Sequence, residues 1–476
     1  MKTGISLSIL FLLTILSSGF VFSSHIEAAD KSKSKNEIDK KNSEYANPVA
    51  RNRGRLYQVS IPPREQDAYE NAYYRLWVPD HVKQIRGVIV RQHGCGAGAR
   101  KYGLEHADDL QWQALARKWD CALLGTQIWA PEEECSTWYM PADGSEHAFF
   151  SALQKLGKLS HHPEIAKAPW CLWGHSGGAL WVMNMLYRNP ERVIAVFPRS
   201  GGLAPVNREL PRSQPLKPDS NSAVFQVPVM FCYGEKENQP GERFYAAVIG
   251  THHVFDVARE KQAQWSVAEH PGSSHENSNS RLLAIRFFDS ILKQRLPNDS
   301  KSTKLKQLDY QSGWLGDLKS KSIQSLMKHQ IVDSKQQSWL PDKKVAAAWR
   351  ELVKSGRILD TSPPAAPLAV QVSSVSGKGV KLEWQAEADL ESGIHAFQVY
   401  RDGEIIGTVQ GHRNQRWNPE GHFHAWNYSD QPIFDDHPAP KMEFLDQTNE
   451  ASSKAKYEIS TVNQAGLKSS RTVGKK

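Results

Sequence analysis

Short apolar runs alternate with amphipathic segments through the first two thirds of this chain. The apolar runs are bounded by turn residues, and the segments between them space their apolar residues three and four positions apart. Such runs are typical of buried strands and such spacing of helices. The expected strands lie at 56–61, 73–78, 86–92, 121–129, 169–173, 193–198, 227–233 and 265–270, and the expected helices at 110–119, 146–159, 178–188, 242–254 and 281–292. This order predicts an α/β fold with a doubly wound, mainly parallel sheet over residues 55–297.

The pattern changes after Pro297. Residues 298–361 are rich in Lys, Ser and Gln, but 343–354 has helical spacing, so we interpret this stretch as a bridging segment with a Trp-rich helix. Its tryptophans could line a polymer-binding groove, although anchoring of the helix is the interpretation we prefer. From residue 362 to 476 the alternation has a period of two, with a hairpin turn at Asp402-Gly403, which predicts a smaller all-β sandwich.

The N-terminus has the pattern of an export signal. Lys2 precedes an apolar run that ends in small residues before Asp30, so we expect a signal peptide at 1–29 and a secreted or periplasmic protein without stable membrane insertion after cleavage. An uncleaved membrane anchor is the alternative. Residues 30–54 are polar and predict a flexible leader.

Candidate chemistry begins at Gly174-His175-Ser176-Gly177-Gly178, which follows an apolar run and precedes a helical pattern. This is the arrangement of a nucleophile elbow, in which a strained turn projects the serine hydroxyl and the flanking glycines avoid collisions. Ser176 is therefore the candidate nucleophile.

A serine hydrolase also needs an acid and a base, in the chain order serine, carboxylate, histidine. The loop after the run 227–233 offers Glu235 and Glu237, and we prefer Glu237 because of its distance from the preceding glycine. The loop after 265–270 offers His275, which we prefer as general base to His270, because His270 lies nearer the strand.

Backbone N–H groups would form the oxyanion hole. Gly177 follows the nucleophile and supplies one donor, and the glycine-rich loop after 86–92 supplies the second, which we assign to Cys95 with Gly96 as the alternative.

Taken together, His93-Gly94-Cys95, Cys135-x-x-Trp138 and Gly-His-Ser-Gly-Gly resemble the α/β-hydrolase superfamily, and within it secreted polyhydroxyalkanoate depolymerase-like and feruloyl or acetyl-xylan esterase-like enzymes. His175, Gly177 and a glutamate as the acid depart from the common pattern of these enzymes. The C-terminal module is similar to a fibronectin type III domain, whose core aromatics Trp384 and Tyr457 match.

Five cysteines in an exported chain suggest a disulfide. Cys121, Cys171 and Cys232 lie in expected strands and are predicted to be buried thiols, whereas Cys95 and Cys135 lie in loops at the expected active-site rim. We therefore predict a Cys95–Cys135 disulfide that holds the oxyanion loop.

The net charge of +8 comes from scattered lysines and does not indicate nucleic-acid binding. Histidine and cysteine spacings match no zinc site, and no cofactor is expected. The sequence thus predicts a secreted serine esterase that cleaves an ester-containing polysaccharide or polyester through an acyl-enzyme on Ser176. A serine peptidase of the same fold and a catalytically silent polymer-binding protein are the alternatives, and the oligomeric state is left open.

Overall fold

The computed structural model describes residues 48–96, 100, 103–130, 137–202, 221–276, 280–328, 333–410, 412–414, 418–422, 442–448 and 450–476. The predicted signal peptide at 1–29 and Cys135 lie outside these residues. Within the predicted leader, Val49–Ala50 (β1) already pairs with the next strand, so regular structure begins before residue 55. Among the described helices, none is long and apolar enough to cross a membrane.

A nine-stranded sheet is formed by strands between residues 49 and 270, in the order β1-β2-β3-β5-β4-β6-β7-β8-β9. The strands β5, β4, β6, β7, β8 and β9 run parallel to one another, and β1, β2 and β3 pair antiparallel at one edge. Their bounds are Gly54–Ile61 (β2), Asn71–Pro79 (β3), Gly87–Gln92 (β4), Cys121–Trp129 (β5), Trp170–His175 (β6), Val193–Arg199 (β7), Val229–Gly234 (β8) and Trp265–His270 (β9). The α/β fold class predicted from the sequence is confirmed, and the sheet has the strand order of an α/β-hydrolase.

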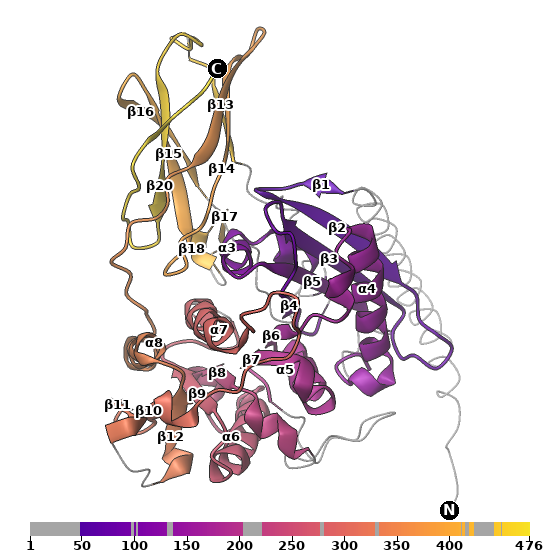
Figure 1. The fold of residues 1–476 in the computed structure, drawn as a ribbon. Coiled ribbons are helices and arrows are strands. Elements are labelled where there is room, and N and C mark those ends of the chain that lie inside the picture. Colours follow the sequence, from indigo (N-terminus) through magenta and orange to yellow (C-terminus); the bar gives the residue numbers. More distant parts are fainter. Residues whose placement is uncertain are drawn as a thin grey trace, which may run out of the picture. The chain divides into compact units, whose positions relative to one another are not determined.

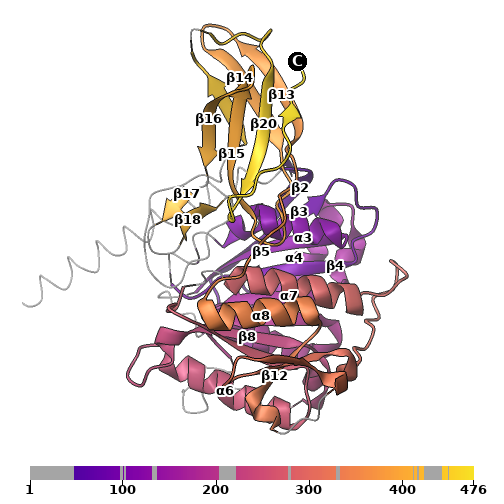
Figure 2. The same ribbon diagram turned by 90° about the vertical axis from the view of Figure 1, so that its left-hand side faces the viewer.

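Helices cover both faces of this sheet (Figures 1 and 2), with α3 and α7 on one face and α4 and α5 on the other. They span Leu110–Lys118 (α3), Ser145–Leu159 (α4), Gly177–Arg188 (α5), Tyr245–Glu260 (α6) and Ser280–Arg295 (α7). The central strands β4, β6 and β7 are buried along their whole length, because helices exclude water from both sides. Functional loops can therefore leave the sheet only at the ends of its strands.

The bridging segment packs on the edge strand β9. It forms a three-stranded sheet, β11-β10-β12, which the sequence did not predict, and the predicted helix α8. The bounds are Trp314–Asp317 (β10), Ile323–Ser325 (β11), Gln337–Leu340 (β12) and Lys343–Ser355 (α8). Trp339 and Trp349 are fully buried, and Trp349 Nε1 donates to the carbonyl of Val267 at 2.8 Å. These two rings anchor the segment and present no surface to a polymer.

The C-terminal region contains antiparallel sheets, as predicted. One sheet has the order β13-β14-β19 and the other β16-β15-β20-β21. The strands are Leu368–Val375 (β13), Gly379–Gln385 (β14), Ile394–Arg401 (β15), Glu404–Gln410 (β16), Glu443–Asp446 (β19), Tyr457–Asn463 (β20) and Thr472–Val473 (β21), and a short β17–β18 pair lies at His412–Asn414 and Asn418–His422. Trp384 and Tyr457 lie in the core between the sheets, and Leu110 and Ala114 of α3 belong to the same buried cluster.

Candidate active site

The turn between β6 and α5 has the geometry of a nucleophile elbow. Ser176 has φ 55° and ψ −119°, a backbone conformation that residues other than glycine rarely adopt. Its N–H donates to the carbonyl of Arg199 at 2.9 Å. A Cβ at Gly174 would lie 2.2 Å from the carbonyl oxygen of Gly178, and one at Gly178 would lie 2.4 Å from that of His93. Only glycine fits at these two positions. With glycine at both, the chain passes from strand β6 to helix α5 through the single residue Ser176.

The predicted acid and base lie in contact. His275 Nδ1 lies 2.6 Å from Glu237 Oε1, and both side chains are buried. The carbonyl of His275 accepts a hydrogen bond from His175 Nε2 at 2.6 Å, which places the base loop against the residue that precedes Ser176. Three loops that are distant in sequence thus meet at the carboxyl end of the parallel strands.

The alternatives considered from the sequence lie elsewhere. Glu235 is exposed and accepts from the N–H of Gly272 at 2.8 Å. His270 is buried, and its Nε2 lies 3.0 Å from the carbonyl of Gly356 at the end of α8. The geometry therefore favours the pair Glu237 and His275, the residues preferred in the sequence analysis.

Glu237 is held in its ionised form. Burial alone would raise the pKa of this carboxyl group, but the hydrogen bond to His275 and the positive charge of Arg199 outweigh burial and lower the pKa to about 2. Its second oxygen, Oε2, accepts from Arg199 Nη1 at 2.9 Å, Ser200 Oγ at 2.6 Å and the N–H of Gly234 at 2.7 Å. The carboxylate is therefore both charged and fixed in orientation.

Packing also fixes the imidazole ring of His275. The ring of Phe244, which precedes α6, stacks on it with centroids 3.5 Å apart and planes 7° apart, and the ring of His175 lies 4.8 Å away. Burial and the nearby His275 lower the pKa of His175 well below its ordinary value, so His175 is neutral and donates from Nε2 to the carbonyl of His275. The sequence analysis did not identify a role for Phe244 or His175.

The predicted oxyanion loop lies beside the serine. A Cβ at Gly94 would be 3.4 Å from Cβ of Ser176. His93 Nδ1 lies 2.6 Å from the carbonyl of Gly94, and the N–H of Ile128 donates to His93 Nε2 at 2.9 Å, so His93 carries its proton on Nδ1. Because a peptide is planar and trans, this bond also sets the direction of the N–H of Cys95.

The other predicted donor, Gly177, is the first residue of α5, and the first N–H groups of a helix have no acceptor within the helix. Cys95 is disulfide-bonded, and Cys121, Cys171 and Cys232 are buried free thiols. Since Cys135 lies outside the described residues, the Cys95–Cys135 pairing stays a prediction.

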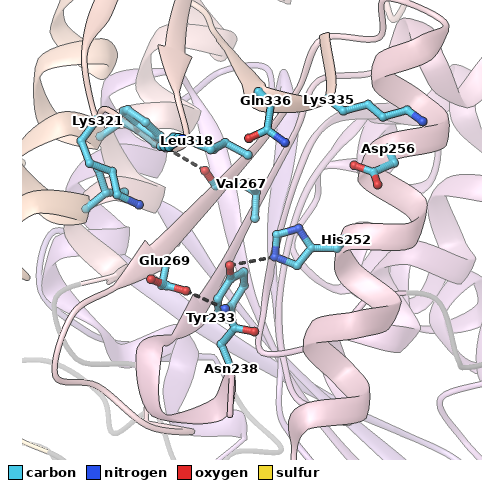
Figure 3. Close-up of a pocket in the computed structure, with 13 residues that line it drawn as sticks. Tyr233, Asn238, His252, Asp256, Val267, Glu269, Leu318, Lys321, Lys335 and Gln336 are labelled. Carbon is cyan, nitrogen blue, oxygen red and sulfur yellow. Dashed lines mark hydrogen bonds between the residues drawn. The ribbon is translucent and has the colours of Figure 1, made fainter. Parts of the chain in front are cut away.

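A separate cavity of about 350 Å³ lies behind the acid loop, between α6, β8, β9 and the bridging segment (Figure 3). Two pairs of its polar side chains bond to each other: Tyr233 to His252 at 2.8 Å, and Asn238 to Glu269 at 2.9 Å. Ser176 and His275 do not line it. Within the described part of the chain, no group of three or more His, Cys, Asp or Glu residues is arranged to hold a metal ion.

No family model and no curated protein matches this chain. Solved structures that resemble it include a thermostable esterase (15% identity, TM-score 0.34, covering 46% of this chain and 55% of that one) and an S-formylglutathione hydrolase from Agrobacterium tumefaciens (13%, 0.36, 52% and 97%). A third is the siderophore hydrolase EstB from Aspergillus nidulans (13%, 0.34, 50% and 93%). This chain thus spans little more than half of the thermostable esterase.

Proposed function

We propose that this protein is a serine hydrolase that cleaves carboxylic esters through an acyl-enzyme on Ser176. The contact between His275 Nδ1 and Glu237 Oε1, next to a strained serine, carries this proposal. An ionised carboxylate on Nδ1 leaves Nε2 unprotonated in the resting imidazole, which is the form that can accept a proton from the serine.

In the first half of the reaction, Ser176 Oγ attacks the ester carbonyl carbon while its proton passes to His275 Nε2. The N–H groups of Cys95 and Gly177 stabilise the oxyanion of the tetrahedral intermediate. The C–O bond to the alcohol then breaks, the alcohol takes the proton from His275, and the acyl group stays on Ser176.

In the second half, water attacks the acyl-enzyme and gives a proton to His275. Collapse of the second intermediate breaks the bond to Ser176 Oγ, which recovers its proton, and the carboxylic acid leaves. Throughout both halves Glu237 stabilises the transient imidazolium without itself being protonated, as its low pKa requires.

The substrate we propose is an ester-bearing polysaccharide or polyester outside the cytoplasm. The signal-like N-terminus, the resemblance to secreted esterases and the fibronectin type III-like module at 362–476 support this proposal, and a Cys95–Cys135 disulfide fits an oxidising compartment. A peptidase would use the same residues, so comparison of acyl-ester, feruloyl, acetyl-xylan, polyhydroxybutyrate and peptide substrates decides between the two.

The test of the mechanism is Ser176→Ala. We expect a loss of at least 10³-fold in ester hydrolysis, because covalent catalysis is removed and only the oxyanion hole and substrate binding remain. A fluorophosphonate probe should label the wild-type protein at Ser176 and leave the variant unlabelled. An unlabelled wild type, or a variant that keeps more than a few per cent of the activity, would refute the proposal.

A further inference from the structure

Arg199 contacts all three loops of the proposed triad. It is the last residue of β7, the strand paired with β6, and its carbonyl accepts the N–H of Ser176 at 2.9 Å. Its side chain is fully buried and donates from Nη1 to Glu237 Oε2 at 2.9 Å. The other terminal nitrogen, Nη2, donates to the carbonyl of Ser274 at 2.8 Å and to that of Glu276 at 2.5 Å.

The two carbonyls bonded by Nη2 are those of the residues on either side of His275. One planar group thus holds the carboxylate on one edge and the peptide backbone around the base on the other. A guanidinium can do this because its donors lie in a rigid fork, whereas a lysine ammonium is a single point that cannot reach both partners.

We infer that Arg199 is a positioning residue, which sets the separation and orientation of the acid and base loops relative to the serine. The inference rests on the proposed function, since it assigns Arg199 a task only if Ser176, His275 and Glu237 react together. Ser200 and Ser273 complete the arrangement, because the Arg199 guanidinium donates to the hydroxyl groups of both.

Two substitutions at Arg199 separate the effect of its geometry from the effect of its charge. Arg199→Lys keeps a cation beside Glu237 but loses the fork, so we expect kcat per labelled active site to fall roughly 10²-fold with KM within about threefold, the loss typical of misplaced catalytic groups. In Arg199→Met the cation is lost too, and the fall in kcat should be larger.

The pH profile of kcat/KM gives a second readout. Among the described residues, the charged and titratable groups near the His275 ring include Glu237, which contacts Nδ1, Arg199, which bonds Glu237, and the neutral His175. Loss of the Arg199 cation favours the imidazolium, so the acid limb of the profile should move to higher pH in Arg199→Met. In Arg199→Lys, which keeps a cation beside Glu237, the limb should stay close to that of the wild type.

Arg259→Lys is the matched control. Arg259 is also fully buried and also donates to a carbonyl, that of Gln337 at 2.8 Å, but it lies on α6 beside the bridging segment. We expect both lysine variants to unfold at lower temperature, and only Arg199→Lys to lose kcat per fluorophosphonate-labelled site.

Equal kcat per labelled site in Arg199→Lys and Arg259→Lys would overturn the inference and leave the proposed function intact, because the role of Arg199 would then be structural alone. Failure of the wild-type protein to react with the fluorophosphonate at Ser176 would instead overturn the proposed function, and the inference with it.

Discussion

Glu237→Gln is the substitution whose effect the structure defines most sharply. It removes one charge and keeps the shape of the side chain. In the native site, Oε2 accepts from Arg199, Ser200 and the N–H of Gly234, while Oε1 faces His275. The oxygen of a glutamine must stay with the three donors, and its NH₂ group is then turned towards His275 Nδ1.

That NH₂ group reverses the tautomer of the base. His275 Nδ1 would have to accept a hydrogen bond, so the proton moves to Nε2 and the ring cannot take the proton of Ser176. The same carboxylate-to-amide change in serine protease triads lowers kcat about 10⁴-fold, which corresponds to about 5 kcal/mol of transition-state stabilisation. We expect a loss of this size in Glu237→Gln.

The substitution should also lower stability. The pKa of Glu237 is about 2 in the fold against 4.5 for a free glutamate, a difference that contributes about 3 kcal/mol to the free energy of unfolding. This pKa is lowered by folding, so the contribution is complete above pH 4.5 and is lost as the pH falls through 2. In the variant the contribution is absent, and unfolding near neutral pH should need less denaturant.

The assay must separate the two effects. Activity is measured on a soluble ester at a temperature where circular dichroism shows the variant to be folded, and kcat is scaled to the titrated amount of folded protein. Glu235→Gln is the control. The carboxylate of Glu235 is exposed, and among the described contacts it bonds only the N–H of Gly272. If kcat of Glu237→Gln fell less than tenfold, or less than that of Glu235→Gln, the tautomer argument would be refuted.

Three further outcomes are expected. Burial lowers the pKa of His270 to about 4. The free energy of unfolding should therefore be highest above pH 6.5 and should decline by up to about 1.4 kcal/mol per pH unit as the pH falls towards 4, because the unfolded chain binds a proton there and the folded protein does not. Denaturant titrations of His270→Gln should show a flatter decline. Non-reducing peptide mapping should find Cys95 linked to Cys135, and two unmodified thiols would contradict this pairing. Deletion of 363–476 exposes Leu110 of α3, so the melting temperature should fall, while kcat per labelled site on a soluble ester should hold because the proposed triad lies outside the deleted part; a drop in this kcat would show that the module reaches the active site.

The sequence alone determined the alternation of strands and helices and the position of the elbow. Buried parallel strands need continuous apolar runs, and the turn at Ser176 tolerates only glycine at positions 174 and 178. The strands and the elbow can therefore be recognised from short stretches of sequence. The order of serine, carboxylate and histidine could be recognised as well, because each residue follows an apolar strand and the carboxyl ends of these strands lie at the same edge of the sheet.

Tertiary structure decided which side chains meet. Glu235 and Glu237 are two residues apart in the same loop, and only the buried position of Glu237 against His275 and Arg199 separates them. Arg199 itself follows an apolar run and gives no local signal, since the acid and base loops that its side chain contacts lie 38 to 77 residues further along the chain. The bridging sheet was missed for a similar reason: its strands are three or four residues long and pair across turns, so they lack the length over which periodicity can be recognised.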